Sequence, residues 1–240
     1  MLQVVAVPAF TDNYIWLVHD EASGETAVVD PGDAAPALAE AQRRGWTVTQ
    51  VWNTHHHWDH SGGNIAMKEA TGCTVSGPAA ENIPGRDVAL LEGSELRIGD
   101  HAGRVMEIPG HTLGHVALIF EADRIAFVGD TLFAMGCGRL FEGTAQQMRG
   151  SLQRLAELPE DTALYCGHEY TLANGRFAAH VEPGNGAIAR RLEEVAQLRA
   201  AGKITLPTTV AQERETNPFV RASSWEEFAR LRSEKDSFRS

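Results

Sequence analysis

The chain has 240 residues and a formal net charge of −11, from 21 Lys and Arg against 32 Asp and Glu. No basic run offsets this charge, which argues against nucleic acid as a partner because phosphate neutralisation needs clustered cations. No apolar stretch approaches the ~18 to 20 residues of a membrane span, and residues 1–8 lack the features of a signal peptide. The three cysteines are too few for a disulfide framework. We therefore expect a soluble, cytoplasmic protein.

Hydrophobic alternation predicts strands through the first two thirds of the chain, interrupted by helical stretches. This mixture is typical of an α/β or α+β layered domain in which connecting loops carry function. After about residue 170 the strand signals fade and helical patterns follow, which indicates a small helical domain. The expected strands are 2–7, 13–19, 26–30, 48–53, 104–108, 116–120, 124–129 and 162–166, and the expected helices are 34–44, 64–70, 145–155, 186–201 and 225–235.

Candidate metal ligands are concentrated in residues 54–60, where four histidines and one aspartate fall within seven residues. The segment follows the predicted strand 48–53 and precedes a turn that enters a helix, so we expect a loop at the C-terminal end of a strand. Side chains two apart on an extended segment point to the same side, so His55 and His57 can share an ion. Asp59 and His60 are placed to bind a second ion better than to complete one tetrahedral site.

Three later residues of ligand type each follow a glycine at or near the end of an apolar run: His111, Asp130 and His168. Taken alone, each histidine could be a hydrogen-bonded loop residue and Asp130 a cap of the following turn or helix. Their joint occurrence with residues 55–60 favours a metal centre over these structural interpretations.

The His-x-His-x-Asp-His run at 55–60, followed in order by His111, Asp130 and His168, resembles the metallo-β-lactamase superfamily. Further segments narrow the resemblance to the glyoxalase II (hydroxyacylglutathione hydrolase) family, and the likeness covers essentially the whole chain. These segments are 136–139, 167–171, 180–185 and 232–238.

The resemblance implies an α+β fold, a four-layer αββα sandwich over residues 1–170, followed by a helical substrate-binding domain over residues 171–240. It also implies a dinuclear centre, most simply zinc, although iron and manganese accept the same ligands. The implied ligands are His55, His57 and His111 for the first metal, Asp59, His60 and His168 for the second, and Asp130 as the bridge between them.

The resemblance further implies contacts with a glutathione moiety from Arg139, Tyr170, Arg232 and Lys235. Arg232 and Lys235 are three apart and hence on one face of a helix, where two cations can bind carboxylates. Arg139 stands where better-known members tend to have Lys, so charge is conserved there. Phe141 stands where they tend to have Tyr, so a hydroxyl is lost.

The implied reaction is hydrolysis of S-2-hydroxyacylglutathiones, S-D-lactoylglutathione first among them, in methylglyoxal detoxification. We expect the protein to be a monomer. Metal lowers the pKa of bound water from about 15.7 toward about 7, so a bridging hydroxide can attack the carbonyl while Asp59 and Asp130 hold and orient it. A thiolate leaves readily, so a thioester needs no dedicated general acid. The alternatives are a persulfide dioxygenase and other hydrolases of the superfamily.

Other residues near these motifs have competing interpretations. We expect His56 to have a supporting role or to face solvent, and His115 to support a ligand by hydrogen bonding. Cys166 is expected to be a small buried strand residue. Asp30 fits two roles equally well, orientation of a ligand and formation of an Asp-Pro-Gly turn.

Overall fold

The computed structural model describes residues 2–239. Within it the chain divides into two compact units, the first of residues 2–107 and 114–129 and the second of residues 108–113 and 130–239. The expected division of labour between a catalytic domain over 1–170 and a substrate-binding domain over 171–240 stays a prediction, because compactness and function are different properties.

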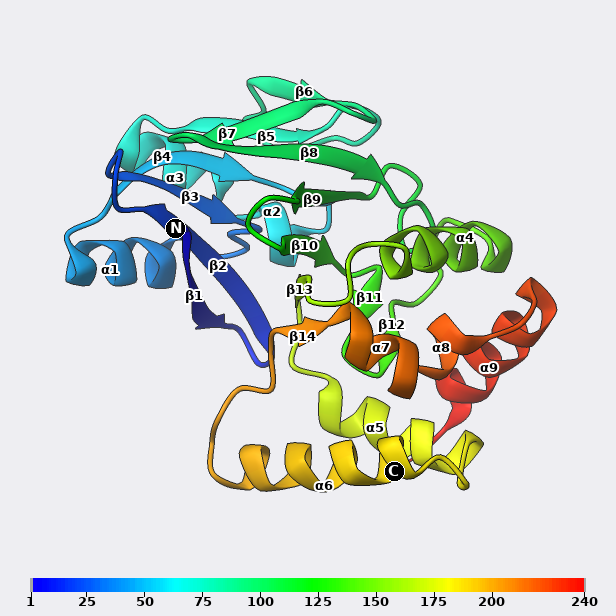
Figure 1. Ribbon diagram of the computed structural model, residues 1–240. Coiled ribbons are helices and arrows are strands. Elements are labelled where there is room, and N and C mark those ends of the chain that lie inside the picture. The colour runs from blue at the N-terminus through cyan, green and yellow to red at the C-terminus, as the bar shows by residue number, and fades with distance from the viewer. Residues whose placement is uncertain (1, 240) are drawn as a thin grey trace. The chain divides into compact units, whose positions relative to one another are not determined.

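The first unit contains a sheet of six strands in the order β1-β2-β3-β4-β5-β6, antiparallel from β1 to β3 and parallel from β3 to β6. Helices α1 (Ala34–Arg44) and α3 (Asn64–Thr71) connect parallel strands and pack against this sheet (Figure 1). Asp33 caps the start of α1 and Gly45, in the left-handed conformation, ends it. The strands are β1 (Leu2–Ala9), β2 (Asn13–Asp20), β3 (Glu25–Val29), β4 (Thr47–Trp52), β5 (Thr74–Pro78) and β6 (Val88–Leu90).

A second set of antiparallel strands in the first unit runs in the order β10-β9-β8-β7. Every residue of β9 and β10 is buried, as the continuous apolar runs of these segments require. Trp52 of β4 stacks on Phe120 of β9 with ring centroids 5.5 Å apart, so the two layers share an apolar core. The strands are β7 (Glu95–Ile98), β8 (His101–Glu107), β9 (Val116–Phe120) and β10 (Ile125–Gly129).

The second unit is mainly helical. Its short strands pair as β11 with β12 and β13 with β14, and Phe177, Phe219 and Phe228 form a fully buried aromatic core. The elements are β11 (Leu132–Phe133), β12 (Gly136–Cys137), α4 (Ala145–Ala156), β13 (Ala163–Cys166), α5 (Thr171–Val181), α6 (Gly186–Ala200), β14 (Thr208–Thr209), α7 (Val210–Thr216), α8 (Pro218–Arg221) and α9 (Trp225–Ser237).

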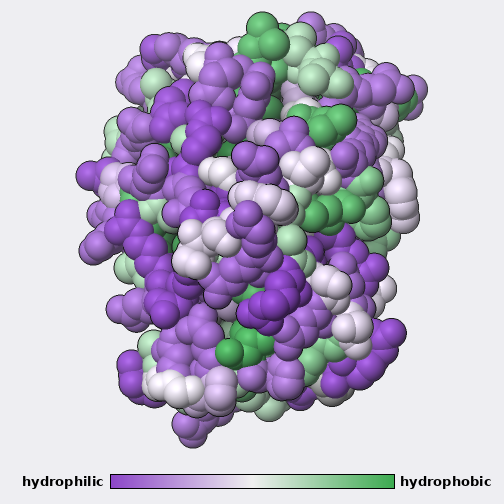
Figure 2. All heavy atoms as spheres, turned by 90° about the vertical axis from the view of Figure 1, so that its right-hand side faces the viewer, coloured by the Kyte–Doolittle hydropathy of each residue, from purple (hydrophilic) through white to green (hydrophobic). Residues whose placement is uncertain are grey.

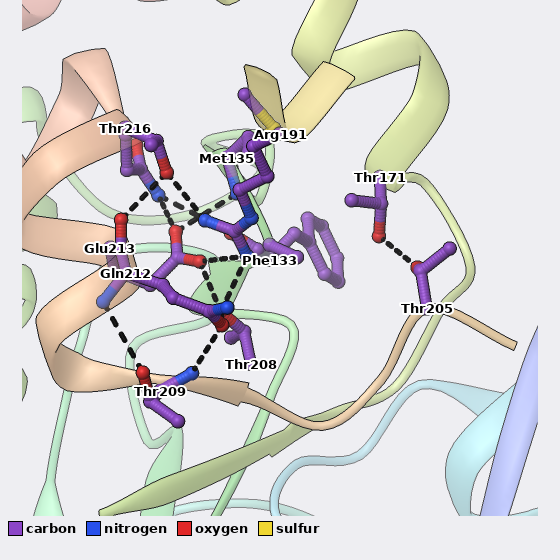
Figure 3. Close-up of polar contacts among 12 residues, drawn as sticks. Phe133, Met135, Thr171, Arg191, Thr205, Thr208, Thr209, Gln212, Glu213 and Thr216 are labelled. Carbon is purple, nitrogen blue, oxygen red and sulfur yellow. Dashed lines mark hydrogen bonds and ion pairs between the residues drawn. The ribbon is translucent and has the colours of Figure 1, made fainter. Parts of the chain in front are cut away.

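A buried ion pair links helices α6 and α7 of the second unit (Figure 3). Arg191 donates to Glu213 at 2.8 Å and also to the hydroxyls of Thr208 and Thr216. The other oxygen of Glu213 accepts the backbone N–H of Met135 at 2.9 Å. The pair therefore fixes the turn between β11 and β12, close in sequence to the candidate ligand Asp130.

All of the expected strands and helices are present with small shifts at their ends. The sequence patterns missed several elements, among them β5, α5 and the short helix α2 (Trp58–Ser61). Among the described residues no helix is long and apolar enough to cross a membrane. On the face displayed in Figure 2, hydrophilic residues predominate and hydrophobic ones form small separate patches.

Candidate metal centre

Of the candidate ligands of the first unit, His55 and His57 lie on the loop after β4, as the sequence predicts, and Asp59 and His60 lie in the short helix α2 that follows it. The strand ends at Trp52, and α2 begins at Trp58. His55 and His60 are almost completely buried at 0% and 1% exposure. Nε2 of His55 lies 3.1 Å from Nδ1 of His57, and Nε2 of His60 lies 3.5 Å from an oxygen of Asp59. The loop therefore brings together the two expected pairs, His55 with His57 and Asp59 with His60.

Hydrogen bonds to Thr54 determine which nitrogen of His55 has a free lone pair. The Thr54 hydroxyl donates its single hydrogen to Asp30 at 2.7 Å, so toward Nδ1 of His55, 3.0 Å away, it can act only as an acceptor. Nδ1 of His55 must then carry the hydrogen. This leaves the Nε2 lone pair directed toward His57.

Asp30 orients His60 in the same way. Its carboxylate accepts the backbone N–H of Thr54 at 2.8 Å and lies 3.2 Å from Nδ1 of His60, which therefore donates. The Nε2 lone pair of His60 is left facing Asp59. Asp30, His55 and His60 each have one potential ligand atom that lies within 4.8 Å of those of the other two residues. The Asp30 side chain thus contacts the candidate ligand His60, while its backbone carbonyl accepts the N–H of Gly32 at 2.9 Å, so features of both interpretations are present.

A close backbone approach supports the same loop. A Cβ atom on Gly32 would lie 1.9 Å from the carbonyl oxygen of Asp59, so only glycine fits at this position. The Asn13 side chain donates to a carboxylate oxygen of Asp59 at 3.0 Å and contacts its backbone oxygen at 3.3 Å. Asp59 is thus held through both its side chain and its main chain.

The second unit brings together the other three expected ligands. An oxygen of Asp130 lies 3.5 Å from Nε2 of His111 and 3.3 Å from Nε2 of His168. The carbonyl of Arg139 accepts from Nδ1 of His111 at 2.9 Å, which again leaves Nε2 with the lone pair. A Cβ on Gly138 would lie 1.9 Å from the Asp130 carbonyl oxygen, so the Arg139 carbonyl reaches His111 only because residue 138 is glycine.

These donor sets fit divalent metal ions. In His55, His60 and His111 the nitrogen away from the cluster is anchored to an oxygen, and the free lone pair is directed toward another ligand-type atom. Metal-binding histidines in proteins show this arrangement, because the outer hydrogen bond fixes the tautomer and the ring orientation. Imidazole and carboxylate ligands suit zinc and also iron or manganese.

His56 and Cys166 lie where their expected roles require, and His115 packs against a candidate ligand. His56 points to Glu81, with Nδ1 3.0 Å from the carboxylate. His115 is fully buried and stacks on His55 with centroids 4.6 Å apart, whereas the hydrogen bond expected of it stays a prediction. Cys166 is buried in β13, and burial raises the pKa of its thiol far above the ordinary value.

The residues expected to contact glutathione are all in the second unit but differ in exposure. Arg139 is largely exposed, 3.7 Å from Asp236. Tyr170 stacks on His168 with centroids 4.8 Å apart. Arg232 is buried, where it donates to the carbonyl of Cys137 and to Asp236, each at 2.9 Å.

Lys235 is half-buried near these residues. Its Nζ donates to the Ala173 carbonyl at 3.0 Å and lies over the Phe177 ring. Burial, together with the nearby Arg232 cation, lowers the pKa of Lys235 to about 8. Phe141, which the resemblance places where a hydroxyl is usual, is exposed and packs edge-on against His111.

Thr54, Asn13 and Glu81 are the supporting residues that the sequence did not reveal. Glu81 bonds to His56 and also accepts the backbone N–H of Gly114 at 3.1 Å. Each makes a hydrogen bond to a residue distant in the sequence, which no spacing pattern encodes, although Thr54 also contacts the adjacent His55. Of the three, Thr54 was the easiest to find from the sequence, because it immediately precedes the histidine run.

Comparison with known proteins agrees with this geometry. The family model described as "Metallo-beta-lactamase superfamily" matches residues 9–168, and the one described as "Hydroxyacylglutathione hydrolase C-terminus" matches residues 169–238. A protein named hydroxyacylglutathione hydrolase from Methylococcus capsulatus is 53% identical over 233 residues, which cover 96% of this chain and 91% of that protein. The chain belongs to the hydroxyacylglutathione hydrolase family of the metallo-β-lactamase superfamily.

Solved structures confirm the expected fold class of this family member. The crystal structure of ETHE1 from Myxococcus xanthus matches with a TM-score of 0.76 and 27% identity, over 100% of this chain and 92% of that one. The crystal structure of TTHA1623 in a di-iron-bound form matches with a TM-score of 0.63 and 25% identity, over 89% and 98% of the two chains.

Proposed function

We propose that this protein hydrolyses the thioester bond of S-2-hydroxyacylglutathiones, with S-D-lactoylglutathione as the first substrate. The observation that carries the proposal is the 53% identity, over nearly the full length of both chains, to a hydroxyacylglutathione hydrolase. A family model for the C-terminal part of such hydrolases also matches residues 169–238. These names describe hydrolysis of a substrate in which a hydroxyacyl group is joined to glutathione.

The proposed centre holds two divalent metals, with His55, His57 and His111 as ligands of one, Asp59, His60 and His168 as ligands of the other, and Asp130 shared. The anchored Nδ1 atoms of three of these histidines support the assignment. When bound, such metals polarise a carbonyl and lower the pKa of a water molecule. We propose zinc in both positions, and the di-iron form of TTHA1623 makes iron the first alternative to test.

The chain's own residues have separate tasks in this proposal. Asn13 fixes Asp59, and Asp30 fixes His60, so the reacting groups meet a preorganised set of side chains. Asp59 and Asp130 orient the attacking water through their carboxylates. The leaving group is a thiol of ordinary pKa about 8.5, so the chain needs no buried general acid to protonate it.

Glutathione is proposed to bind the cations of the second unit, Arg139, Arg232 and Lys235, with Tyr170 beside the substrate. Nε of Arg232 is buried and has no hydrogen-bond partner among residues 2–239, which leaves it a donor for a ligand. The other two donor groups of Arg232 hold Cys137 and Asp236. Arg232 would therefore also position the segment that leads to Arg139.

We further propose that the protein is a cytoplasmic monomer that takes part in methylglyoxal detoxification, with neither a membrane nor a nucleic acid as partner. The acidic net charge of −11 supports the last point, since it opposes binding to phosphate backbones. The division into a catalytic domain over residues 1–170 and a substrate-binding domain over 171–240 belongs to the same proposal.

The test is loss of thioester absorbance when metal-loaded protein meets S-D-lactoylglutathione. A chelated sample, a thioester without glutathione and the Lys235→Ala variant run beside it. Rapid, chelator-sensitive turnover of the glutathione thioester, with a raised KM in the variant, is expected. Absence of turnover with two metals bound would refute the proposal, and oxygen uptake with glutathione persulfide would then identify a persulfide dioxygenase.

A further inference from the structure

Two exposed aromatic side chains contact each other in the first unit. Phe10 is 49% exposed and Trp58 is 68% exposed. Their ring centroids are 4.9 Å apart with an interplanar angle of 67°, an edge-to-face contact. Single exposed hydrophobic residues are ordinary on protein surfaces, but here two large rings form one apolar surface, which we call the aromatic pair.

The segments that carry the aromatic pair also carry or contact candidate metal ligands. Trp58 is the first residue of α2, between His57 and Asp59 in the sequence, so its Cα is about 3.8 Å from that of each neighbour. Phe10 is the first of three residues in the turn between β1 and β2. The pair of strand residues next to this turn is Ala9 and Asn13. Because Asn13 donates to Asp59 at 3.0 Å, the turn that presents Phe10 is fastened to the helix that presents Trp58.

The backbone of Phe10 is also unusual. Its φ is 50°, in the left-handed region that bulky side chains rarely adopt. Both the exposure of the ring and this conformation are unfavourable for the free protein. Residues held in such strained backbone conformations are concentrated at the sites where proteins contact ligands.

We propose that the aromatic pair binds the apolar part of the substrate's acyl group and makes the enzyme favour bulky aryl or alkyl 2-hydroxyacyl groups. The inference rests on the proposed function, which places the reacting carbonyl at the ligands flanking Trp58. The reacting carbonyl carbon is bonded to the glutathione sulfur on one side and to the 2-hydroxy carbon of the acyl group on the other, and we assign the group on that second side to these rings. Glutathione, which carries charges, is assigned to the cations of the second unit instead.

The size of the aromatic pair argues for a small occupant. A stable interface between two copies of a protein buries about 800 Å² on each partner, whereas one aromatic side chain contributes roughly 150–250 Å² when fully buried. Two rings that already cover each other in part cannot supply such an interface. They are sufficient for one phenyl or short alkyl group.

The test compares kcat/KM for S-D-mandeloylglutathione and S-D-lactoylglutathione in the metal-loaded, full-length protein. Phe10→Ala removes the ring without changing any residue of the ligand loop, and Phe10→Leu restores an apolar group. Leu91→Ala removes a comparably exposed hydrophobic residue from outside the site. An aromatic contact is worth up to about tenfold in binding. We expect Phe10→Ala to lower the mandeloyl-to-lactoyl ratio roughly five- to tenfold, Phe10→Leu to recover most of it, and Leu91→Ala to leave it unchanged.

The outcomes separate this inference from the proposed function. An unchanged ratio in Phe10→Ala, in protein that hydrolyses both thioesters, would overturn the inference alone. An equal fall with both substrates, or a change of oligomeric state by light scattering, would also overturn it, by assigning the aromatic pair to folding or to an interface between copies. If the unaltered protein hydrolyses neither thioester, the proposed function fails and the inference fails with it.

Discussion

Replacement of Asp30 by asparagine tests how the candidate ligands are oriented. One carboxylate oxygen becomes an NH₂ group, and in either orientation of the amide an acceptor is lost. With the NH₂ group in place of Oδ2, it faces the Thr54 hydroxyl and Nδ1 of His60, which now approach that oxygen at 2.7 and 3.2 Å. Nδ1 of His60 must then accept, which moves the hydrogen to Nε2. The Thr54 hydroxyl must turn its hydrogen toward His55, which has the same effect on that ring.

The expected magnitude follows from the number of groups affected. Two histidines lose the lone pairs that face the cluster, and loss of such outer hydrogen bonds usually weakens metal binding by about 10- to 100-fold. Each lost hydrogen bond to a buried charged group is worth about 1.5–3 kcal/mol. With a net loss of about 2 kcal/mol after relaxation, a chain of this size should melt roughly 4–8 °C lower.

The assay measures metal affinity by chelator competition. The melting temperature is measured separately in excess chelator, and nitrogen NMR of the histidine rings reports their tautomers. Asp33→Asn is the matched control, because Asp33 caps α1 from the same loop and asparagine caps equally well. Unchanged metal affinity in Asp30→Asn, with Nδ1 of His60 still protonated, would refute the orientation argument.

Three further changes have defined outcomes. Gly138→Ala places a Cβ 1.9 Å from the Asp130 carbonyl oxygen, so metal content and turnover should each fall at least about tenfold, measured by elemental analysis and thioester hydrolysis. Because burial lowers the pKa of Lys235 to about 8, this side chain loses its charge as pH rises through that value; KM should rise roughly tenfold by about pH 9 in the unaltered protein and stay level in Lys235→Arg. Arg191→Met leaves Glu213 buried without its partner, which should cost about 3–5 kcal/mol in urea unfolding, whereas a loss below 1 kcal/mol would contradict the burial of this pair.

Local patterns were sufficient to predict the main strands and the ligand loop, because both depend on spacing along the chain. Helix α5 was missed because Gly175 interrupts its pattern, and glycine is a poor helix former. The structure gives the reason for this glycine: a Cβ there would lie 3.0 Å from Leu192 and 3.2 Å from the sulfur of Met135. Tertiary packing outweighs helix propensity at that position.

The hydrogen-bond partners of the ligands could not be predicted in the same way. His55 and His57 are two residues apart, and their pairing follows from that spacing. The contact of Asp30 with His60 joins residues thirty positions apart and depends on how two loops meet. The environment of Arg232 was also hidden, since its helical spacing places it on one face with Lys235 but does not reveal that the side chain is buried against Cys137.

Backbone strain is found at Asp30, which contacts the candidate ligand His60, and at Met135, in the turn that follows the candidate ligand Asp130 in the sequence. Asp30 has a φ of 51° and Met135 a φ of 60°, a conformation that costs on the order of 1–3 kcal/mol for a residue other than glycine. In each case a distant partner holds the strained backbone N–H: the carbonyl of Trp52 for Asp30, at 3.0 Å, and the Glu213 carboxylate for Met135, at 2.9 Å. Hydrogen bonds to charged groups contribute about 1.5–3 kcal/mol, enough to offset the strain at Met135. Because these bonds belong to the protein alone, the turns that orient the ligands are maintained by the fold itself, and a metal ion would meet lone pairs that already face the cluster.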